Sequence, residues 1–246
     1  MKPARSGLGT PAKAGIVVII VVLVLAAAYL APSMSSGGGT SSSSTSQSAG
    51  QSSSLFTGSQ DIGLSDLFGH FSQMQINEAT YDHSEGNALI DQHTLGYQVL
   101  GKASLNNTQY TKVQFTQVGE SNTEVAWFNP QGGIDRVDVL GAANYTGTSA
   151  SVYVQIYVAA FSLITGTSNN STLFTILSKA SEATTSIGPT ALDVATYTLA
   201  APTPPYTSVT VKYTTIPGTN LRLAVYFDEN TSDLMEATTQ VLSITK

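Results

Sequence analysis

The sequence has no cysteine among its 246 residues. This absence excludes a disulfide framework, a Cys-ligated zinc or iron–sulfur site, a thiol nucleophile and a lipid anchor attached through cysteine. Cations are also scarce, with ten Lys and Arg against sixteen Asp and Glu, which gives a net charge of -6. Because nucleic acid binding needs a basic face, we expect no nucleic acid partner.

Charge is missing altogether from a long stretch near the N-terminus. Residues 14–31 are apolar or small, and as a helix they would span ~27 Å, close to the ~30 Å hydrocarbon core of a bilayer. Three basic residues precede this stretch, and no acidic residue comes before Asp61. The positive-inside rule therefore predicts a cytoplasmic end at 1–13, a single membrane anchor at 14–31 and an extracellular remainder.

Two other interpretations of this stretch stay open. The small residues Ala26, Ala27 and Ala28 would suit a signal peptidase, so the segment could be a cleaved secretory signal. The sequence Lys13-Ala14-Gly15 before the apolar residues resembles the class III, pilin-type signal of archaeal surface proteins. Each of the three routes exports the residues that follow.

Large apolar residues are nearly absent from the next segment, 32–59, which is rich in serine and glycine. Such a composition cannot bury a core and is typical of a flexible linker. We therefore expect a disordered stalk between the anchor and a folded domain at 60–246.

Five sequons for N-glycosylation follow the predicted anchor, in agreement with an extracellular location. The acceptor candidates are Asn106, Asn144, Asn169, Asn170 and Asn230.

Hydrophobic periodicity in 60–246 predicts mostly strands. Apolar and polar residues alternate in Tyr97–Lys102, Lys112–Thr116 and Val209–Thr214, and every second residue of Leu221–Phe227 is apolar. Further strands are expected at Thr123–Phe128, Ile134–Leu140 and Leu234–Leu242. The predicted turns contain residues that favour chain reversal, and they lie at Asn106–Thr108, Asn129–Gly133 and Asp228–Ser232.

Three segments show helical spacing instead. Asp61–Phe71 predicts an amphipathic helix, and Ser171–Ala183 predicts a second one with a cap at Ser171 and a stop at Gly188-Pro189. Ser151–Thr165 is apolar almost all round, which favours a buried helix, although its first half would also suit a strand. The predicted fold class is α+β, with a curved antiparallel sheet, as a half-barrel or a sandwich, and a few helices.

This order of elements resembles the open half-barrel of the periplasmic lipoprotein carriers and related lipid-binding lipoproteins. The resemblance depends on two hairpins in which an apolar strand ends in a polar turn, at Trp127–Gly132 and Tyr226–Asn230. It implies a concave face that accepts an acyl chain. The aromatic residues that would line this face are Trp127, Phe128, Tyr153, Phe161 and Phe174.

Recognisable catalytic motifs are missing, so we expect no enzyme, no cofactor and no metal centre. One group of ligand-type residues occurs, but its spacing matches no metal motif, and we interpret it as an exposed polar loop. Its members are His70, Glu78, Asp82, His83, Glu85, Asp91 and His93.

The sequence thus predicts a membrane-anchored extracellular module for binding or for cell-surface organisation. Its partners would be the membrane, through 14–31, and either an apolar ligand or other surface proteins. The alternatives are a half-barrel lipid carrier and a pilin-like filament subunit.

Overall fold

The computed structural model describes residues 60–246, except 62, 142–144, 166–176 and 200–203. The predicted cytoplasmic end, anchor and stalk therefore lie outside the described residues.

Strands dominate the described part of the chain. The strands are β1 (Gln60–Asp61), β2 (Gln73–Asp82), β3 (Ala88–Leu105), β4 (Thr108–Gln117), β5 (Thr123–Phe128), β6 (Ile134–Leu140), β7 (Tyr145–Gly147), β8 (Leu177–Ile187), β9 (Thr190–Leu199), β10 (Tyr206–Thr215), β11 (Leu221–Thr231) and β12 (Met235–Thr245). The helices are α2 (Leu64–His70), α3 (Gln155–Thr165) and the 3-10 helices η2 (His83–Glu85) and η3 (Thr148–Val154).

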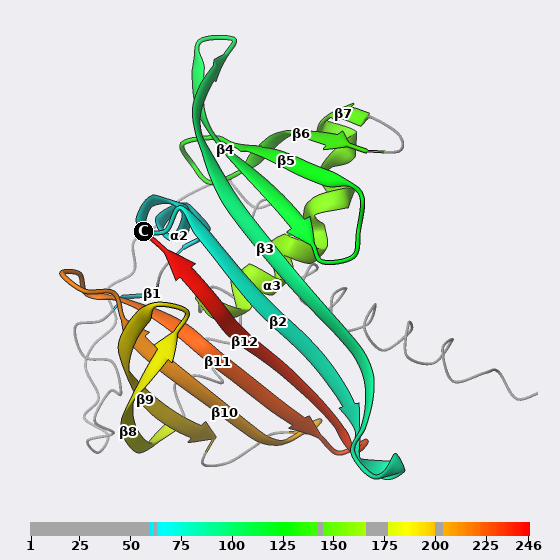
Figure 1. Cartoon of the computed structure of the whole chain (residues 1–246), viewed down its shortest axis with the longest axis vertical. Coiled ribbons are helices and arrows are strands. Elements are labelled where there is room, and N and C mark those ends of the chain that lie inside the picture. Colours follow the sequence, from blue (N-terminus) through cyan, green and yellow to red (C-terminus); the bar gives the residue numbers. More distant parts are fainter. Residues whose placement is uncertain (1–59, 62, 142–144, 166–176, 200–203) are drawn as a thin grey trace, which may run out of the picture.

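All described strands belong to one open sheet (Figure 1). Their order is β7-β6-β5-β4-β3-β2-β12-β11-β10-β9-β8, and β1 pairs in parallel with β11. Every other neighbouring pair is antiparallel. The pairing of β2 with β12 joins the first and last long strands, so the two meanders form one continuous surface.

Two hairpin turns agree with the sequence prediction. Asn106 and Asn107 form a two-residue turn with φ of 50° and 63°, a conformation that asparagine tolerates better than most residues. In the turn between β5 and β6, the Oδ1 of Asn129 accepts hydrogen bonds from the backbone N–H groups of Gln131 and Gly133. The predicted strands on either side of this turn are confirmed as β5 and β6.

The helices α2 and α3 lie on one face of the sheet, which we name the helix face, and the opposite face is the front face (Figure 1). Aromatic side chains from both helices and from β3–β5 pack together here. The rings of Phe68 and Tyr97 are 5.0 Å apart, those of Tyr97 and Phe161 are 5.0 Å apart, and Phe115 stacks on Tyr157 at 5.1 Å. This cluster forms the centre of the hydrophobic core.

The β8–β9 end of the sheet curls back toward β12. A Cβ on Gly188, in the turn between these strands, would lie 3.5 Å from the Cβ of Ser243. Leu192 and Val194, on β9 shortly after this turn, are buried. The sheet is therefore strongly curved at its β8 end. The helices α2 and α3 cover its helix face (Figure 1).

One predicted helix is wrong where it can be tested. Of the segment Ser171–Ala183, the residues from Leu177 onward form the edge strand β8, and 171–176 lie outside the described residues. Gly188, with φ of 56°, does not end a helix but makes the tight turn to β9, so that Ile187 pairs with Thr190. Cross-strand pairing outweighs the weak helical spacing here.

Three further boundaries differ from the prediction. The segment that contains Glu78 and His93 is not a loop but belongs to β2 and β3, and only His83–Asn87 connects the two strands. Of Ser151–Thr165, the α-helical part begins at Gln155, after the 3-10 helix η3. The last turn begins after Thr231, because β11 continues three residues beyond Asp228.

The helix from Thr148 to Thr165 is long and apolar enough to cross a membrane, and 56% of it is buried inside the protein. It packs on β11 and β12 and supplies Phe161 and Ile164 to the core. A buried core helix accounts for its hydrophobicity. The fold is mostly β, an open antiparallel sheet with two α-helices in the described part, and the predicted sandwich alternative is not what forms.

Candidate functional site

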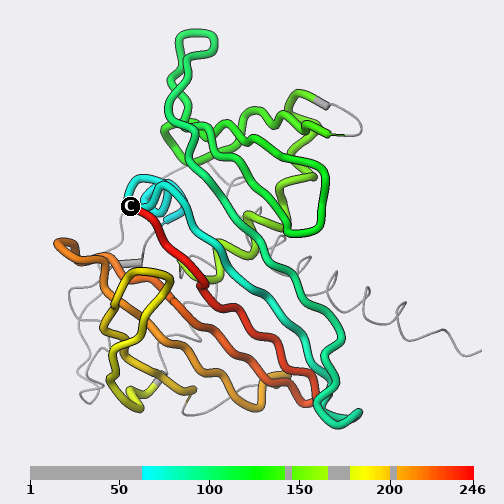
Figure 2. The backbone as a smooth tube through the Cα atoms, in the orientation of Figure 1, coloured from blue at the N-terminus to red at the C-terminus, as the bar shows by residue number. Residues whose placement is uncertain are grey.

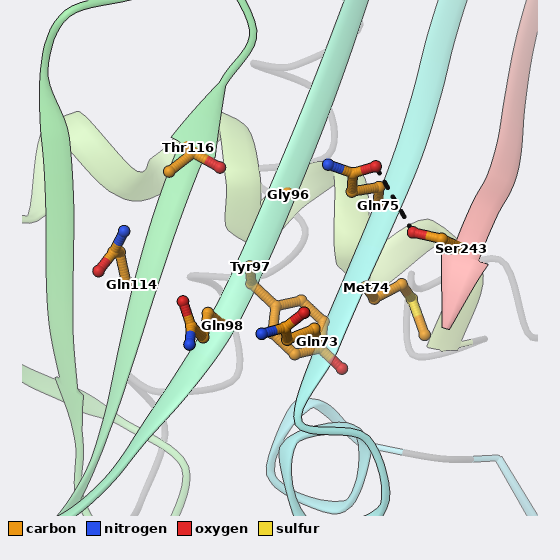
Figure 3. A pocket seen from close by; sticks show the side chains of 9 residues that line it. All are labelled: Gln73, Met74, Gln75, Gly96, Tyr97, Gln98, Gln114, Thr116 and Ser243. Carbon is orange, nitrogen blue, oxygen red and sulfur yellow. Dashed lines mark hydrogen bonds between the residues drawn. The ribbon is translucent and has the colours of Figure 1, made fainter. Parts of the chain in front are cut away.

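A shallow groove of ≈ 270 Å³ lies on the front face, across β12, β2, β3 and β4 (Figure 3). We name it the amide groove. Its lining residues are Gln73, Met74, Gln75, Gly96, Tyr97, Gln98, Gln114, Thr116 and Ser243.

Strand register explains why these residues meet. Ser243, Gln75, Gly96 and Thr116 pair in turn across the four strands and form one row. A second row, two residues along each strand, consists of Thr245, Gln73, Gln98 and Gln114. Directly paired residues point to the same side of a sheet, so both rows face the front.

The depression results from Gly96. Its neighbours in the row carry side chains, and a Cβ at this position would lie 3.1 Å from the Oγ1 of Thr116 and 3.5 Å from the Cγ of Gln75. Because Gly96 is not among the residues with positive φ, the backbone does not require glycine there. The missing side chain opens space above the sheet.

The chemistry of the groove is polar and uncharged. Four glutamine amides and the hydroxyls of Thr116 and Ser243 surround it, and Ser243 donates a hydrogen bond of 3.5 Å to the Oε1 of Gln75. The side chain of Tyr97 points away to the helix face, where its hydroxyl donates to the carbonyl oxygen of Phe71 at 3.2 Å. Burial there raises the pKa of Tyr97 far above its usual value. No carboxylate or cation therefore lines the groove.

A charged and aromatic cluster lies beside the groove on the same face. Lys112, Trp127 and Arg136 pair in turn across β4, β5 and β6, with the two cations 4.9 and 4.8 Å from the centre of the indole. The Nε1 of Trp127 donates a hydrogen bond of 2.9 Å to the Oδ2 of Asp138. Hydrogen bonds from Arg136 and Trp127 hold the pKa of Asp138 below its usual range, against the effect of burial.

The helix face carries a separate polar cluster toward the connection between β2 and β3. His93 lies 2.9 Å from Asp91 through its Nε2, and the Nε2 of Gln117 lies 3.0 Å from its Nδ1. The ring of His93 thus lies between Asp91 and Gln117. Glu78 pairs directly with His93, and burial, together with the charge of Asp91, raises the pKa of Glu78 to about 7.

A second carboxyl on the helix face, that of Glu229, also has a raised pKa. Glu229 lies two residues beyond the buried Phe227 on β11, and its pKa is also raised to about 7, mainly by burial and then by the charge of Asp228. Within the described ranges, no three His, Asp or Glu residues are placed so that they could hold a metal ion. His70 lies in the last turn of α2, outside the strands β2 and β3 that carry this cluster.

The remaining ligand-type residues belong to the turn after β2. Asp82 accepts hydrogen bonds from the N–H and the hydroxyl of Ser84, which lower the pKa of Asp82, and Glu85 is exposed. The Nε2 of His83 lies 2.9 Å from Glu236 and 3.1 Å from the Oδ1 of Asn230. These residues stabilise the end of the sheet.

The aromatic residues predicted to line a concave face lie in different surroundings. Phe128 and Phe161 are fully buried in the core, where Phe128 packs 4.9 Å from Phe68. Trp127 lies on the front face, and Tyr153 is 42% exposed on η3. Phe174 lies outside the described residues.

The sequence did not predict the amide groove. A signal was present in Gln73-Met74-Gln75-Ile76-Asn77, which alternates polar and apolar residues as a strand does. The partnership of Gln75 with Ser243 has no local signal, because the two residues are 168 positions apart.

No protein-family model and no curated protein matches the sequence. Solved structures show distant similarity in fold. MucB in complex with MucA(peri) is 8% identical, with a TM-score of 0.34 over 74% of this chain, which spans 54% of MucB. A DUF1329 family protein from Desulfovibrio piger is 9% identical, with a TM-score of 0.26 over 72% of this chain and 85% of its own.

A lipoprotein from Parabacteroides distasonis is 12% identical, with a TM-score of 0.23 over 72% of this chain and 96% of its own. These proteins share open-sheet folds seen among exported proteins and lipoproteins. At such TM-scores the similarity gives no basis for an assignment of function.

Proposed function

We propose that this chain is a binding module, without catalytic activity, that is held outside the cell membrane and recognises an uncharged, hydroxyl-rich polymer such as a neutral polysaccharide in the amide groove. The observation that carries the proposal is the pair of uncharged rows around Gly96.

Hydrogen-bond capacity supports this ligand class. Each glutamine amide of Gln73, Gln75, Gln98 and Gln114 offers both donors and an acceptor, and a sugar hydroxyl does the same. Neighbouring strands are ~4.8 Å apart, so amides on adjacent strands can contact successive groups of an extended polymer. An anionic or cationic ligand would find no opposite charge in the groove.

The absence of charged groups also supports a role in binding alone. The hydroxyl of Ser243 is the candidate nucleophile in the groove, and its partner is the Gln75 amide, which cannot act as a general base. The basic residues before the apolar segment 14–31 support display outside the membrane, and the stalk would lift the sheet away from the lipid.

The test is co-sedimentation of the full chain, in detergent, with a panel of insoluble neutral and anionic polysaccharides. We expect sedimentation with at least one neutral polymer, and at least about tenfold weaker binding for Gln98→Ala, because hydrogen bonds are lost. Gln109→Ala, an exposed glutamine elsewhere on β4, is the matched control and should bind normally. Binding only to anionic polymers, or equal binding by Gln98→Ala, would overturn the proposal.

A further inference from the structure

The hairpin between β3 and β4 projects beyond the body of the sheet (Figure 2). β2 pairs with β3 only as far as Gln98, and β5 pairs with β4 only from Thr111 onward. The residues between them form a two-stranded arm that ends in the turn of Asn106 and Asn107. This arm is the part of the described chain most clearly separated from neighbouring strands.

The tip of the arm presents a sequon. Asn106 and Asn107 are exposed, and Leu105 pairs with Thr108, so Asn106-Asn107-Thr108 occupies the reversal itself. Asn106 has φ of 50° in this turn, and within the described residues its side-chain amide makes no hydrogen bond. An enzyme could reach this amide without unfolding the sheet.

The sequon at Asn230 has the opposite surroundings. Asn230 is half-buried within β11, and its Nδ2 donates a hydrogen bond of 3.1 Å to the Oδ1 of Asp228. Its Oδ1 lies 3.1 Å from the Nε2 of His83. A bulky group on this amide would break both contacts and separate β11 from the turn after β2.

We infer that Asn106 is the acceptor of an N-linked glycan and that Asn230, despite its sequon, is not. In the reaction the Nδ2 of Asn106 attacks the anomeric carbon of an oligosaccharide carried on a polyprenyl phosphate or diphosphate. The N–C bond forms, the bond from that carbon to the phosphate oxygen breaks, the lipid phosphate leaves and Nδ2 loses one proton. No group is oxidised or reduced.

The test is peptide mass spectrometry of the full chain purified from the cells that produce it. Trypsin releases Ala103–Lys112 with Asn106 as its one sequon, and Leu223–Lys246 with Asn230 as its one sequon. We expect a glycan mass on most copies of the first peptide and none on the second. A first peptide without glycan, or a glycan on the second, would overturn the inference.

Two variants at Thr108 distinguish glycosylation from other modifications. Thr108→Ala destroys the sequon and should abolish the added mass, whereas Thr108→Ser keeps the sequon and should retain it. An added mass that survives in Thr108→Ala would contradict an N-linked glycan. The inference shares the extracellular location of the proposed function but none of the groove contacts, so polysaccharide binding and glycosylation can fail independently.

Discussion

Gly96 and Thr116 pair across β3 and β4, and a Cβ on Gly96 would lie 3.1 Å from the Oγ1 of Thr116. This distance is shorter than an ordinary van der Waals contact. The hydroxyl can move by a few tenths of an ångström, so an alanine fits at a modest energetic cost but fills the floor of the amide groove.

We therefore predict that Gly96→Ala folds but binds the polysaccharide at least about tenfold more weakly, equivalent to ~1.4 kcal/mol. The free energy of unfolding should fall by no more than ~1 kcal/mol, because alanine suits a strand at least as well as glycine. Urea unfolding and a binding isotherm on the same preparation would measure both quantities. If the variant lost binding only because it unfolds, its urea midpoint would fall far below that of the wild type.

Glu78 and Glu229 predict a specific dependence of stability on pH. Their pKa values rise from 4.5 to about 7 in the folded protein, so the folded state retains protons that the unfolded state releases between these values. Their contribution to the free energy of unfolding is thus complete below pH 4.5 and is lost as pH rises through about 7.

The double variant Glu78→Gln, Glu229→Gln should remove most of this loss and be more stable than the wild type at pH 8. Urea unfolding at pH 5 and pH 8 is the measurement. Glu85→Gln, at the exposed turn, is the control and should retain the wild-type dependence. An unchanged pH dependence in the double variant would refute the assignment to these two carboxyls.

Phe161 and Tyr153 should differ sharply when each is replaced by alanine. Phe161 is 0% exposed and packs against Tyr97 and Phe115, so Phe161→Ala should reduce the free energy of unfolding by ~3–5 kcal/mol. Tyr153 is 42% exposed, and Tyr153→Ala should change it by less than ~1 kcal/mol. Similar values for the two would show that the helix-face core is not packed as described.

Trp127, the one tryptophan of the chain, should stabilise the β4–β6 surface through its indole N–H as well as its ring. Trp127→Phe keeps a ring between Lys112 and Arg136 but loses the hydrogen bond to Asp138, at a cost of ~1–3 kcal/mol. Trp127→Leu also loses the cation–π contacts, which adds ~1 kcal/mol. Urea unfolding followed by circular dichroism tests this order, and equal stabilities of the two variants would contradict it.

The local parts of the fold were predictable from sequence. β5 and β6 are rich in β-forming residues on both sides of a turn that contains Pro130 and two glycines, and α2 has a clear amphipathic stripe with Leu64, Leu67 and Phe68 buried. In these segments the propensity, the hydrophobic period and the turn residues agree.

The segments whose secondary structure was not predicted lack such agreement. β2 carries the polar residues Glu78 and Thr80 on the helix face, the face that is apolar at Met74 and Ile76, so the alternation breaks off in mid-strand. β8 is an edge strand with few buried side chains, so no periodic pattern marks it. The amide groove could not be predicted for a third reason. It requires β12 to pair with β2, and no local pattern in either strand specifies that partner.

The most direct measurement of the central claim is a set of adsorption isotherms for a neutral polysaccharide, taken with wild type and Gly96→Ala at low and high salt. Interactions between exposed charges are screened over ~3 Å at 1 M salt, whereas hydrogen bonds to uncharged groups are not. The account predicts that wild-type affinity changes less than about twofold with salt, and that Gly96→Ala binds about tenfold more weakly at both concentrations. Equal binding by the two proteins, or wild-type binding that disappears at high salt, would contradict an uncharged ligand in the amide groove.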